Sequence, residues 1–393
     1  MSDRVKVLSV FGTRPEAIKL APLLLKMAKQ PERFESIVCA TGQHDRMLRQ
    51  ALAAFQLSPD YNLDVMTANQ RLSDLTAKLV VGLGRVIAEV QPSVVLVQGD
   101  TTTTFSAALA AFYARVPVSH VEAGLRSWDR ENPFPEETNR VLTDRLSSSF
   151  FAPTELNRRN LLDEGVAPER IFVTGNTAID ALLLMRDRVA GADPNSWADA
   201  WGSAREVVAD RARPIVLITA HRRESFGEPF QEMCAALNEL ATTHPAWSFV
   251  YPVHLNPNVQ DTVNATLGST ENIHLIEPLD YDAFVYLMDR ACLILTDSGG
   301  IQEEAPSLQK PVIVMREKTE RTEAIEAGTA ILVGTNKQNI KDAVEKLMTD
   351  RTLYEAVAAR NNPYGDGFAS DRILEQLYES LRADQLALCS SVV

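Results

Sequence analysis

Short apolar runs rich in β-branched residues alternate with helical patterns along most of the chain. Near-continuous apolar strands that alternate with helices are typical of parallel sheets covered by helices on both faces. The sequence therefore predicts an α/β fold built from doubly wound parallel sheets. One series of strand-like runs comprises residues 5–11, 36–40, 93–98, 116–121 and 171–174, and a second comprises residues 215–219, 248–253, 273–276, 292–296, 312–315 and 330–333.

The two series of strands indicate two domains. A chain of 393 residues, 45% of them hydrophobic, can fill two cores, since a domain typically holds about 100–200 residues. The segment 190–213 between the series is rich in small and polar residues. We place the domain switch near 175–190, so that an N-terminal domain covers 1–178 and a C-terminal domain covers 179–370. The amphipathic C-terminal helix, 371–393, is expected to pack back on the first domain.

Composition narrows the class of partner. The net charge of −13 argues against nucleic acid or an anionic membrane as the main partner. Cys39, Cys234, Cys292 and Cys389 lack metal-site and C-x-x-C spacing, which is typical of reduced thiols. The sequence contains no signal-peptide core and no membrane-length apolar run, and it lacks H-E-x-x-H or a close His/Asp cluster. We therefore expect a cytoplasmic protein without a metal.

The turn after the first strand-like run carries one glycine and two cations, where a dinucleotide-binding turn carries three glycines. Gly12 permits a tight turn, and Thr13 and Glu16 have the spacing of a helix capping box. The helix N-terminus, with Arg14 and Lys19, offers positive potential to an anion such as a phosphorylated ligand. A capped helix with two solvated cations explains the same residues, and the motif alone does not separate these two interpretations.

A second turn of this kind lies in the segment "LTDSGGIQEEA". Ser298 can cap a short helix, and the two glycines after it let backbone N–H groups approach an oxyanion. An acidic residue in this helix, Glu303 or Glu304, could accept hydrogen bonds from ribose, while Arg321 could neutralise a phosphate. The alternative is a glycine-assisted turn beside surface carboxylates. The chain lacks G-x-x-x-x-G-K-[ST] and G-x-G-x-x-G, which argues against a P-loop ATPase and a dinucleotide site.

Other polar residues also follow predicted strands or begin helices. They are Asp100, His120, Glu122, Arg126, Glu136, Glu137, His221, Arg222 and Arg223. Individually, such carboxylates are typical of helix caps or surface groups, and a lone histidine is typical of hydrogen-bonded structure. Together, the carboxylates of the first domain and the histidine and arginines of the second are expected to converge on an interdomain cleft. Such a group contains the parts needed for proton transfer.

Ten motifs, which run in order from about residue 7 to residue 335, resemble the non-hydrolysing bacterial UDP-N-acetylglucosamine 2-epimerases. They are "FGTRPEAIKLAPL", "TGQH", "VQGDTTTT", "HVEAGLRS", "PEETNR", "GNTAID", "TAHRRES", "PVHLNPNV", "LTDSGGIQEEA" and "ERTEAIEAG". The least typical stretches are 190–213 and the C-terminal tail.

This resemblance implies two Rossmann-like domains in the glycosyltransferase-B arrangement, with UDP in the cleft. It also implies interconversion of UDP-N-acetylglucosamine and UDP-N-acetylmannosamine at C2, with no nicotinamide or metal consumed. The positions that match the family's UDP-binding residues are Arg14, Lys19, Ser298, Gly299, Gly300, Glu304 and Arg321. The positions that match residues around the sugar are Asp100, Glu122, Glu136 and His221.

The resemblance further implies a homodimer that supplies N-acetylmannosamine units for surface polysaccharides. Some bacterial members also bind a second UDP-N-acetylglucosamine as an activator beside the active site. The positions that match this activator site are Gln43, Arg71, Glu137, Arg222 and His254.

The chemistry at C2 implies an elimination, because a hydrogen next to an acetamido group is barely acidic. Expulsion of UDP from C1 with removal of the C2 proton gives a 2-acetamidoglucal, and UDP then adds back as C2 is protonated on its other face. Asp100, Glu122 and Glu136 are the candidates for this proton transfer, with Glu122 or Asp100 preferred. His221 is expected to contact the diphosphate or the sugar.

Three other functions fit parts of the sequence. A glycosyltransferase of the same architecture would also bind a UDP-sugar, but it commonly carries a basic or amphipathic membrane patch that this sequence lacks. A nucleotide-sugar sensor would not need several proton-transfer residues. Epimerisation of a modified UDP-acetamido sugar stays within the family.

Overall fold

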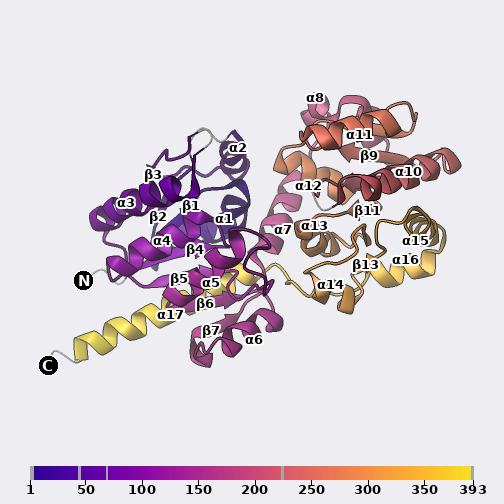
Figure 1. The fold of residues 1–393 in the computed structure, drawn as a ribbon. Coiled ribbons are helices and arrows are strands. Elements are labelled where there is room, and N and C mark those ends of the chain that lie inside the picture. The colour runs from indigo at the N-terminus through magenta and orange to yellow at the C-terminus, as the bar shows by residue number, and fades with distance from the viewer. Residues whose placement is uncertain (1–3, 43–45, 68–69, 223–224, 391–393) are drawn as a thin grey trace. The chain divides into compact units, whose positions relative to one another are not determined.

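The computed structural model describes residues 4–42, 46–67, 70–222 and 225–390. It divides into two compact units, each with its own parallel sheet (Figure 1). The N-terminal unit comprises Met1–Ala181 together with Gly365–Val393, and the C-terminal unit comprises Leu182–Tyr364. The predicted α/β fold with two doubly wound sheets is therefore confirmed.

The sheet of the N-terminal unit has, within the described residues, seven strands in the order β3-β2-β1-β4-β5-β6-β7. All of its pairs are parallel. The strand order reverses between β1 and β4, and ligands of doubly wound sheets bind at the carboxyl ends of strands beside such a switch point. The strands are β1 (Val5–Phe11), β2 (Phe34–Ala40), β3 (Tyr61–Asn62), β4 (Val94–Gln98), β5 (Val118–Val121), β6 (Ser149–Ala152) and β7 (Ile171–Val173).

Helices cover both faces of this sheet. They are α1 (Arg14–Ala28), α2 (Arg46–Phe55), α3 (Leu72–Val90), α4 (Thr102–Tyr113), α5 (Glu136–Leu146), α6 (Glu155–Asp163), the 3-10 helix η1 (Pro168–Arg170) and α17 (Ala369–Ser390). The helix α7 (Thr177–Val189) begins in this unit and ends in the C-terminal unit. Val7 of β1 packs in a core with α1 and α17, whereas Leu8 packs in a core with α3 and α4. Successive side chains of a strand point to opposite faces, which explains why β1 is apolar at nearly every position.

The C-terminal helix α17 belongs to the N-terminal unit (Figure 1). Its apolar residues Ile373, Leu374 and Leu377 are buried in the core that α1 and β1 share. At the start of the helix, the Asp180 carboxylate accepts hydrogen bonds from the backbone N–H groups of Ala369 (3.2 Å) and Ser370 (2.8 Å). The polypeptide therefore returns to its first unit at a defined, hydrogen-bonded point.

The sheet of the C-terminal unit has, among the residues described, six parallel strands in the order β10-β9-β8-β11-β12-β13. Its order reverses between β8 and β11, so the loops after these two strands lie beside the switch point. The strands are β8 (Ile215–Thr219), β9 (Ser248–Pro252), β10 (Ile273–Ile276), β11 (Leu293–Thr296), β12 (Val312–Val314) and β13 (Ala330–Leu332).

Helices of the C-terminal unit include a group of short ones over residues 194–209, within the segment 190–213 that is rich in small and polar residues. There Trp201 is fully buried, and its indole N–H donates to the Pro194 carbonyl oxygen (2.7 Å). The helices are η2 (Pro194–Trp197), α8 (Ala198–Trp201), η3 (Gly202–Ala204), α9 (Arg205–Ala209), α10 (Glu228–Thr243), α11 (Pro257–Leu267), α12 (Tyr281–Arg290), α13 (Gly299–Glu304), η5 (Ala305–Leu308), α14 (Thr322–Ala327), α15 (Lys337–Thr349) and α16 (Arg351–Ala358).

Across the described ranges, no helix combines the length and the apolar character that crossing a membrane requires.

Candidate functional site

The turn between β1 and α1 is tight because its single glycine meets two threonine hydroxyls. A Cβ atom on Gly12 would lie 2.3 Å from Thr103 Oγ1 and 2.5 Å from Thr41 Oγ1. Any larger residue would therefore have to displace the Thr41 and Thr103 side chains. Arg14 is half-buried and lies at the first position of α1. The turn thus presents a cation beside a helix N-terminus, as the anion-binding interpretation requires.

Glu16 accepts hydrogen bonds from the β1–α1 turn and from the loop after β4. It is buried, and its Oε2 accepts hydrogen bonds from the N–H groups of Gly12 (3.0 Å) and Thr13 (2.7 Å). Its Oε1 accepts hydrogen bonds from the hydroxyls of Thr101 (2.6 Å) and Thr104 (2.9 Å). Burial raises the pKa of Glu16, although these hydrogen bonds oppose the shift. One carboxylate therefore ties the β1–α1 turn to the loop that follows β4.

Glu122 lies directly after β5 in the left-handed region, at φ 69°. A non-glycine residue there is uncommon, and such residues cluster at functional sites. Its two carboxylate oxygens lie 2.7 and 2.8 Å from Lys19 Nζ. Gln98 Nε2 donates to the same carboxylate, and Asn176 Nδ2 does so at 3.3 Å. Three elements far apart in sequence thus fix the orientation of one carboxylate.

Lys19 therefore has a position that the sequence did not predict. We expected it to contact the UDP portion of a ligand, and in this structure its ammonium group contacts both oxygens of Glu122. The side chains are 19% and 9% exposed, so solvent screens this ion pair only weakly. The ammonium group therefore lies directly against the Glu122 carboxylate.

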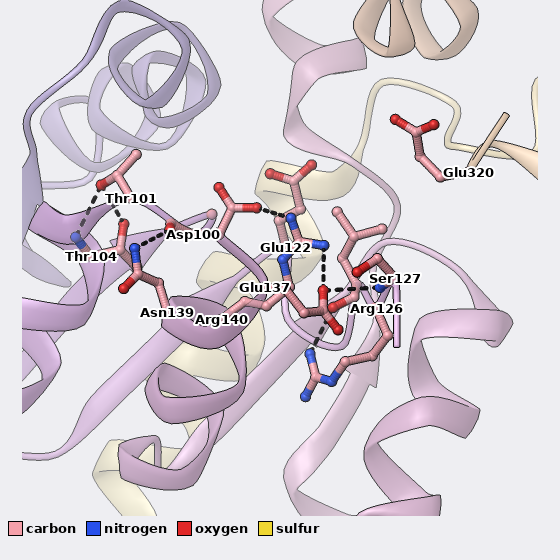
Figure 2. A network of polar contacts seen from close by, with 12 residues as sticks. Asp100, Thr101, Thr104, Glu122, Arg126, Ser127, Glu137, Asn139, Arg140 and Glu320 are labelled. Carbon is pink, nitrogen blue, oxygen red and sulfur yellow. Dashed lines mark hydrogen bonds and ion pairs between the residues drawn. The ribbon is translucent and has the colours of Figure 1, made fainter. Parts of the chain in front are cut away.

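Asp100 belongs to a second polar network, which starts at the loop after β4 (Figure 2). Its carboxylate forms an ion pair with Arg140 of α5, and its carbonyl oxygen accepts a hydrogen bond from Asn139 Nδ2 (3.0 Å). The other side of the Arg140 guanidinium donates to Glu137 Oε2 (3.1 Å). The Asp100 side chain is 26% exposed, whereas the Arg140 side chain is 9% exposed. Asp100 therefore reaches the surface while its carboxylate is paired with a largely buried guanidinium group.

Glu137 is buried and supports the loop that precedes α5. Its carboxylate accepts a hydrogen bond from the backbone N–H group of Ser127 (2.9 Å), which Figure 2 shows, and another from that of Trp128 (3.0 Å). Its exposed fraction is 3%. In this structure Glu137 therefore positions backbone and Arg140. Glu136, its neighbour, begins α5 and is half-buried.

His120 of β5 and Arg126 of the loop after it are both buried. The ring nitrogens of His120 contact Asp144 Oδ1 (2.6 Å) and the Gly99 carbonyl oxygen (2.7 Å), and Arg126 contacts Asp144 Oδ2 (2.7 Å). Burial opposes ionisation of Asp144, but His120 and Arg126 outweigh it and lower the pKa of this carboxyl. These residues therefore support the site from inside the unit.

In the C-terminal unit, the buried Asp297 follows β11 and holds the loop after β8. Its Oδ2 accepts hydrogen bonds from the backbone N–H groups of His221 (2.6 Å) and Arg222 (2.7 Å). The imidazole of His221 stacks on that of His254, with ring centroids 5.1 Å apart and planes 10° from parallel. His221 is thus held through its backbone and packed on one face of its ring.

The Ser298 turn leads into α13, with Arg321 lying over it. A Cβ atom on Gly299 would lie 3.0 Å from Arg321 Cζ, so glycine permits this close approach. Arg321 Nε donates to Glu303 Oε1 (2.8 Å). Gly300 and Glu304 come together on the same helix, since a Cβ on Gly300 would lie 3.8 Å from Glu304 Oε1. The two glycines, Arg321 and Glu304 therefore lie close together at the start of α13.

Three arginines surround Glu320. Its carboxylate contacts Arg316 (2.8 Å), Arg321 (2.9 Å) and Arg222 (3.5 Å). Burial opposes ionisation, but the arginines lower the pKa of Glu320 to about 2. This carboxylate therefore holds three guanidinium groups in one place.

The positions that match an activator site are distributed over both units. Arg71 is the exposed N-cap residue of α3, and Glu137 is a buried residue in the first turn of α5. Arg222 pairs with Glu320, and His254 stacks on His221. Gln43 lies outside the residues that the structure describes.

The comparison with family models identifies the chain. A model described as UDP-N-acetylglucosamine 2-epimerase matches residues 26–378. The chain belongs to the UDP-N-acetylglucosamine 2-epimerase family. The resemblance recognised in its ten motifs is therefore confirmed.

Curated members of the family are similar over nearly their full length. The UDP-N-acetylglucosamine 2-epimerase of Yersinia pestis is 56% identical over 373 residues, which cover 95% of this chain and 98% of the relative. The enzyme of Escherichia coli K12 is 55% identical over the same shares of both chains. Among solved structures, the family member from Neisseria meningitidis bound to UDP-GlcNAc has a TM-score of 0.86 and 47% identity, and covers 95% of this chain and 100% of its own.

Several residues that shape the site were missed in the sequence. Gln98 and Asn176 stand inside recognised motifs but carry no charge, so nothing in their spacing indicated a contact with Glu122. Asp297 directly precedes the recognised Ser298 turn, and Glu320 precedes Arg321. The position of Asp297 beside Ser298, and of Glu320 beside Arg321, was a signal in the sequence that these carboxylates belong to the site. The sequence did not indicate which groups they contact, and the structure does.

Proposed function

We propose that this protein catalyses the reversible C2 epimerisation of UDP-N-acetylglucosamine to UDP-N-acetylmannosamine. The observation that carries the proposal is the Glu122 carboxylate, which lies at the carboxyl end of β5 and is oriented by Lys19, Gln98 and Asn176. Family membership supports the substrate, as do the relative bound to UDP-GlcNAc and the Methanocaldococcus jannaschii relative in complex with UDP-GlcNAc and UDP.

The reaction proceeds by elimination and re-addition of UDP. Departure of UDP from C1 and loss of the C2 proton yield a 2-acetamidoglucal, and protonation of the opposite face of C2 with return of UDP gives the epimer. Positive groups that face the diphosphate stabilise the charge that develops on the leaving group. In this proposal Arg14 and Arg321 are the positive groups that stabilise the departing diphosphate.

Proton transfer falls to the carboxylates of the N-terminal unit. Glu122 is paired with Lys19 and Asp100 with Arg140, so a cation holds each carboxylate in place. An ionised carboxylate is the form that accepts the C2 proton. We therefore assign the two faces of C2 to Glu122 and Asp100: the carboxylate on one face accepts the C2 proton, and the group on the other face, in its protonated form, donates a proton as UDP returns. Glu136 is the further candidate at the start of α5.

Nucleotide binding falls largely to the C-terminal unit. We propose that the backbone of the Ser298 turn, with Gly299 and Gly300, donates to phosphate oxygens while Glu304 accepts from ribose hydroxyls. Glycines at this turn expose the N–H groups, and the adjacent Arg321 adds charge. His221 contacts the diphosphate or the sugar.

We also propose that the enzyme works as a cytoplasmic homodimer and that a second UDP-N-acetylglucosamine activates it. The positions Arg71, Glu137, Arg222 and His254 match the family's activator site, together with Gln43. A plot of rate against UDP-N-acetylglucosamine concentration is expected to be sigmoidal, and light scattering is expected to give twice the mass of one chain.

The decisive experiment uses a single substrate. The protein is incubated with UDP-N-acetylglucosamine alone in deuterated water, and C2 is followed by NMR. We expect UDP-N-acetylmannosamine to form and deuterium to enter C2 of both sugars. Unchanged substrate would contradict the proposal and would favour a transferase, a sensor or an enzyme for a modified sugar.

A further inference from the structure

Asp297 is a fully buried carboxylate with two different neighbours. It follows β11, and its backbone N–H donates to the Thr219 carbonyl oxygen at the end of β8 (3.0 Å). Its Oδ2 accepts from the backbone N–H groups of His221 (2.6 Å) and Arg222 (2.7 Å). One carboxylate oxygen is therefore sufficient to hold the loop after β8 against β11.

The other oxygen, Oδ1, points at the His221 imidazole. It is buried and forms no hydrogen bond with any described residue, and it lies 3.6 Å from His221 Nδ1. A buried anionic oxygen without a donor is strongly unfavourable, so such an atom normally has a partner in the working state of a protein. A movement of a few tenths of an ångström by the ring would bring Nδ1 within hydrogen-bond distance.

We propose that Asp297 is the positioning residue of His221: its Oδ1 accepts a hydrogen bond from Nδ1–H, and Nε2 is thereby presented to the UDP-sugar. This inference rests on the proposed function, which places His221 at the diphosphate or the sugar. A carboxylate behind an imidazole fixes both the tautomer and the orientation of the ring.

The surroundings of His221 favour a fixed ring. His254 stacks on one face of the imidazole, and 40% of the His221 side chain stays exposed. Burial lowers the pKa of His221, as do His254 and Arg222, whereas Asp297 raises it. The nearby Tyr251 hydroxyl donates to the Ala220 carbonyl oxygen (2.5 Å). Asp297 is thus the group that favours protonation of this histidine.

A purely structural role for Asp297 would need only Oδ2. An asparagine supplies one such oxygen for the two backbone N–H groups, so Asp297→Asn preserves the loop contact. Its NH₂ group then replaces Oδ1 and faces Nδ1 as a donor. This arrangement favours the opposite tautomer of His221, with the proton on Nε2. The substitution therefore separates holding the loop from orienting the ring.

The test measures the tautomer of His221 directly, by NMR of isotope-labelled histidine in the full-length protein. His221→Asn assigns the signal. In the wild type we expect the proton on Nδ1 at neutral pH, and in Asp297→Asn we expect it on Nε2 with a lower pKa of His221. We expect kcat to fall by about 10²–10⁴-fold, by analogy with the same exchange behind other histidines.

A matched control is Asp350→Asn. Asp350 is another aspartate of the C-terminal unit whose carboxylate accepts a backbone N–H, that of Leu353 (3.0 Å). This variant is expected to leave both the His221 tautomer and kcat unchanged.

The wild-type tautomer alone can overturn the inference, even if Asp297→Asn does not fold. A neutral His221 with its proton on Nε2 in the wild type contradicts the proposal, and so does an Asp297→Asn variant with unchanged tautomer and pH profile. If the tautomer changes as expected but the wild type does not epimerise UDP-N-acetylglucosamine, the positioning role of Asp297 stands and the proposed function fails.

Discussion

Glu16 offers a sharp test of how the N-terminal site is held together. Replacement by alanine would remove the acceptor of the Gly12 and Thr13 N–H groups and of the Thr101 and Thr104 hydroxyls. The Thr104 hydroxyl can turn to the Gln98 carbonyl oxygen (2.8 Å), but the two backbone groups cannot turn. An unsatisfied donor costs about 1–3 kcal/mol when it is buried, and these backbone donors are partly buried, so each counts near the lower end of that range. The hydroxyls of Thr13 and Thr101 also lose their acceptor, so Glu16→Ala is expected to destabilise the N-terminal unit by about 3–5 kcal/mol in total.

Glu16→Gln is not expected to destabilise the N-terminal unit. The amide oxygen replaces Oε2 at the backbone N–H groups, and the NH₂ group donates to Thr101 and Thr104, whose hydroxyls can accept. Burial raises the pKa of Glu16, so its charged form destabilises the fold once the pH exceeds both its unfolded value and its raised folded value. The glutamine lacks this charge. It is therefore expected to be as stable as the wild type or more stable, with the larger gain at neutral pH than at acidic pH.

Hydrogen exchange of the segment 8–20, followed by mass spectrometry, reports on this unit without assuming that the whole chain unfolds in one step. Glu16→Ala should exchange faster by about 10²–10³-fold at the turn, which corresponds to the lower part of the range given above, while Glu16→Gln should match the wild type. Equal destabilisation in both variants would show that the charge itself is required. An alanine variant within about 1 kcal/mol of the wild type would refute the role of the two backbone donors.

Three further changes test other parts of the site. Glu122→Gln is expected to lower turnover by at least about 10²-fold and to leave UDP binding intact in calorimetry, and wild-type turnover would remove Glu122 from the chemistry. Gly299→Ala would place a Cβ 3.0 Å from Arg321 Cζ and is expected to weaken UDP binding about 10-fold, whereas Gly191→Ala, which meets no atom within 4 Å, should not. Because Glu320 has a pKa of about 2 against an ordinary 4.5, its ion pairs should stabilise the C-terminal unit at neutral pH and be lost as the pH falls from 4.5 towards 2. Glu320→Gln should remove that acid-dependent part of the unfolding free energy, and an unchanged acid profile would contradict it.

The sequence predicted the sheets well because parallel strands buried on both faces are apolar throughout. The bounds of β1, β8 and β10 agree with the predicted runs residue for residue. The strands β3 and β6 were missed for different reasons. Only two residues of β3 pair with β2, and β6 reads "SFFA", which contains no β-branched residue.

Sequence reasoning placed the site residues at strand ends but could not assign their partners. In the N-terminal sheet, Asp100 and Glu122 come after β4 and β5, and in the C-terminal sheet the Ser298 turn comes after β11. Within each sheet the parallel strands bring their carboxyl ends to one edge, where ligands bind, so these positions could be predicted. The contact of Lys19 with Glu122 joins residues 103 positions apart, and spacing in the sequence carries no information about such a pair. The same holds for the carboxylates of Asp297 and Glu320.

The central claim is that UDP leaves the anomeric carbon and later returns to it. A heavy oxygen isotope placed in the bridge between C1 and the β-phosphorus tests this directly, since free rotation of a detached UDP exchanges the bridging oxygen with the other oxygens of that phosphate. We expect phosphorus NMR to show the label moving out of the bridge in substrate recovered during turnover. A label that stays entirely in the bridge while C2 epimerises would contradict the claim.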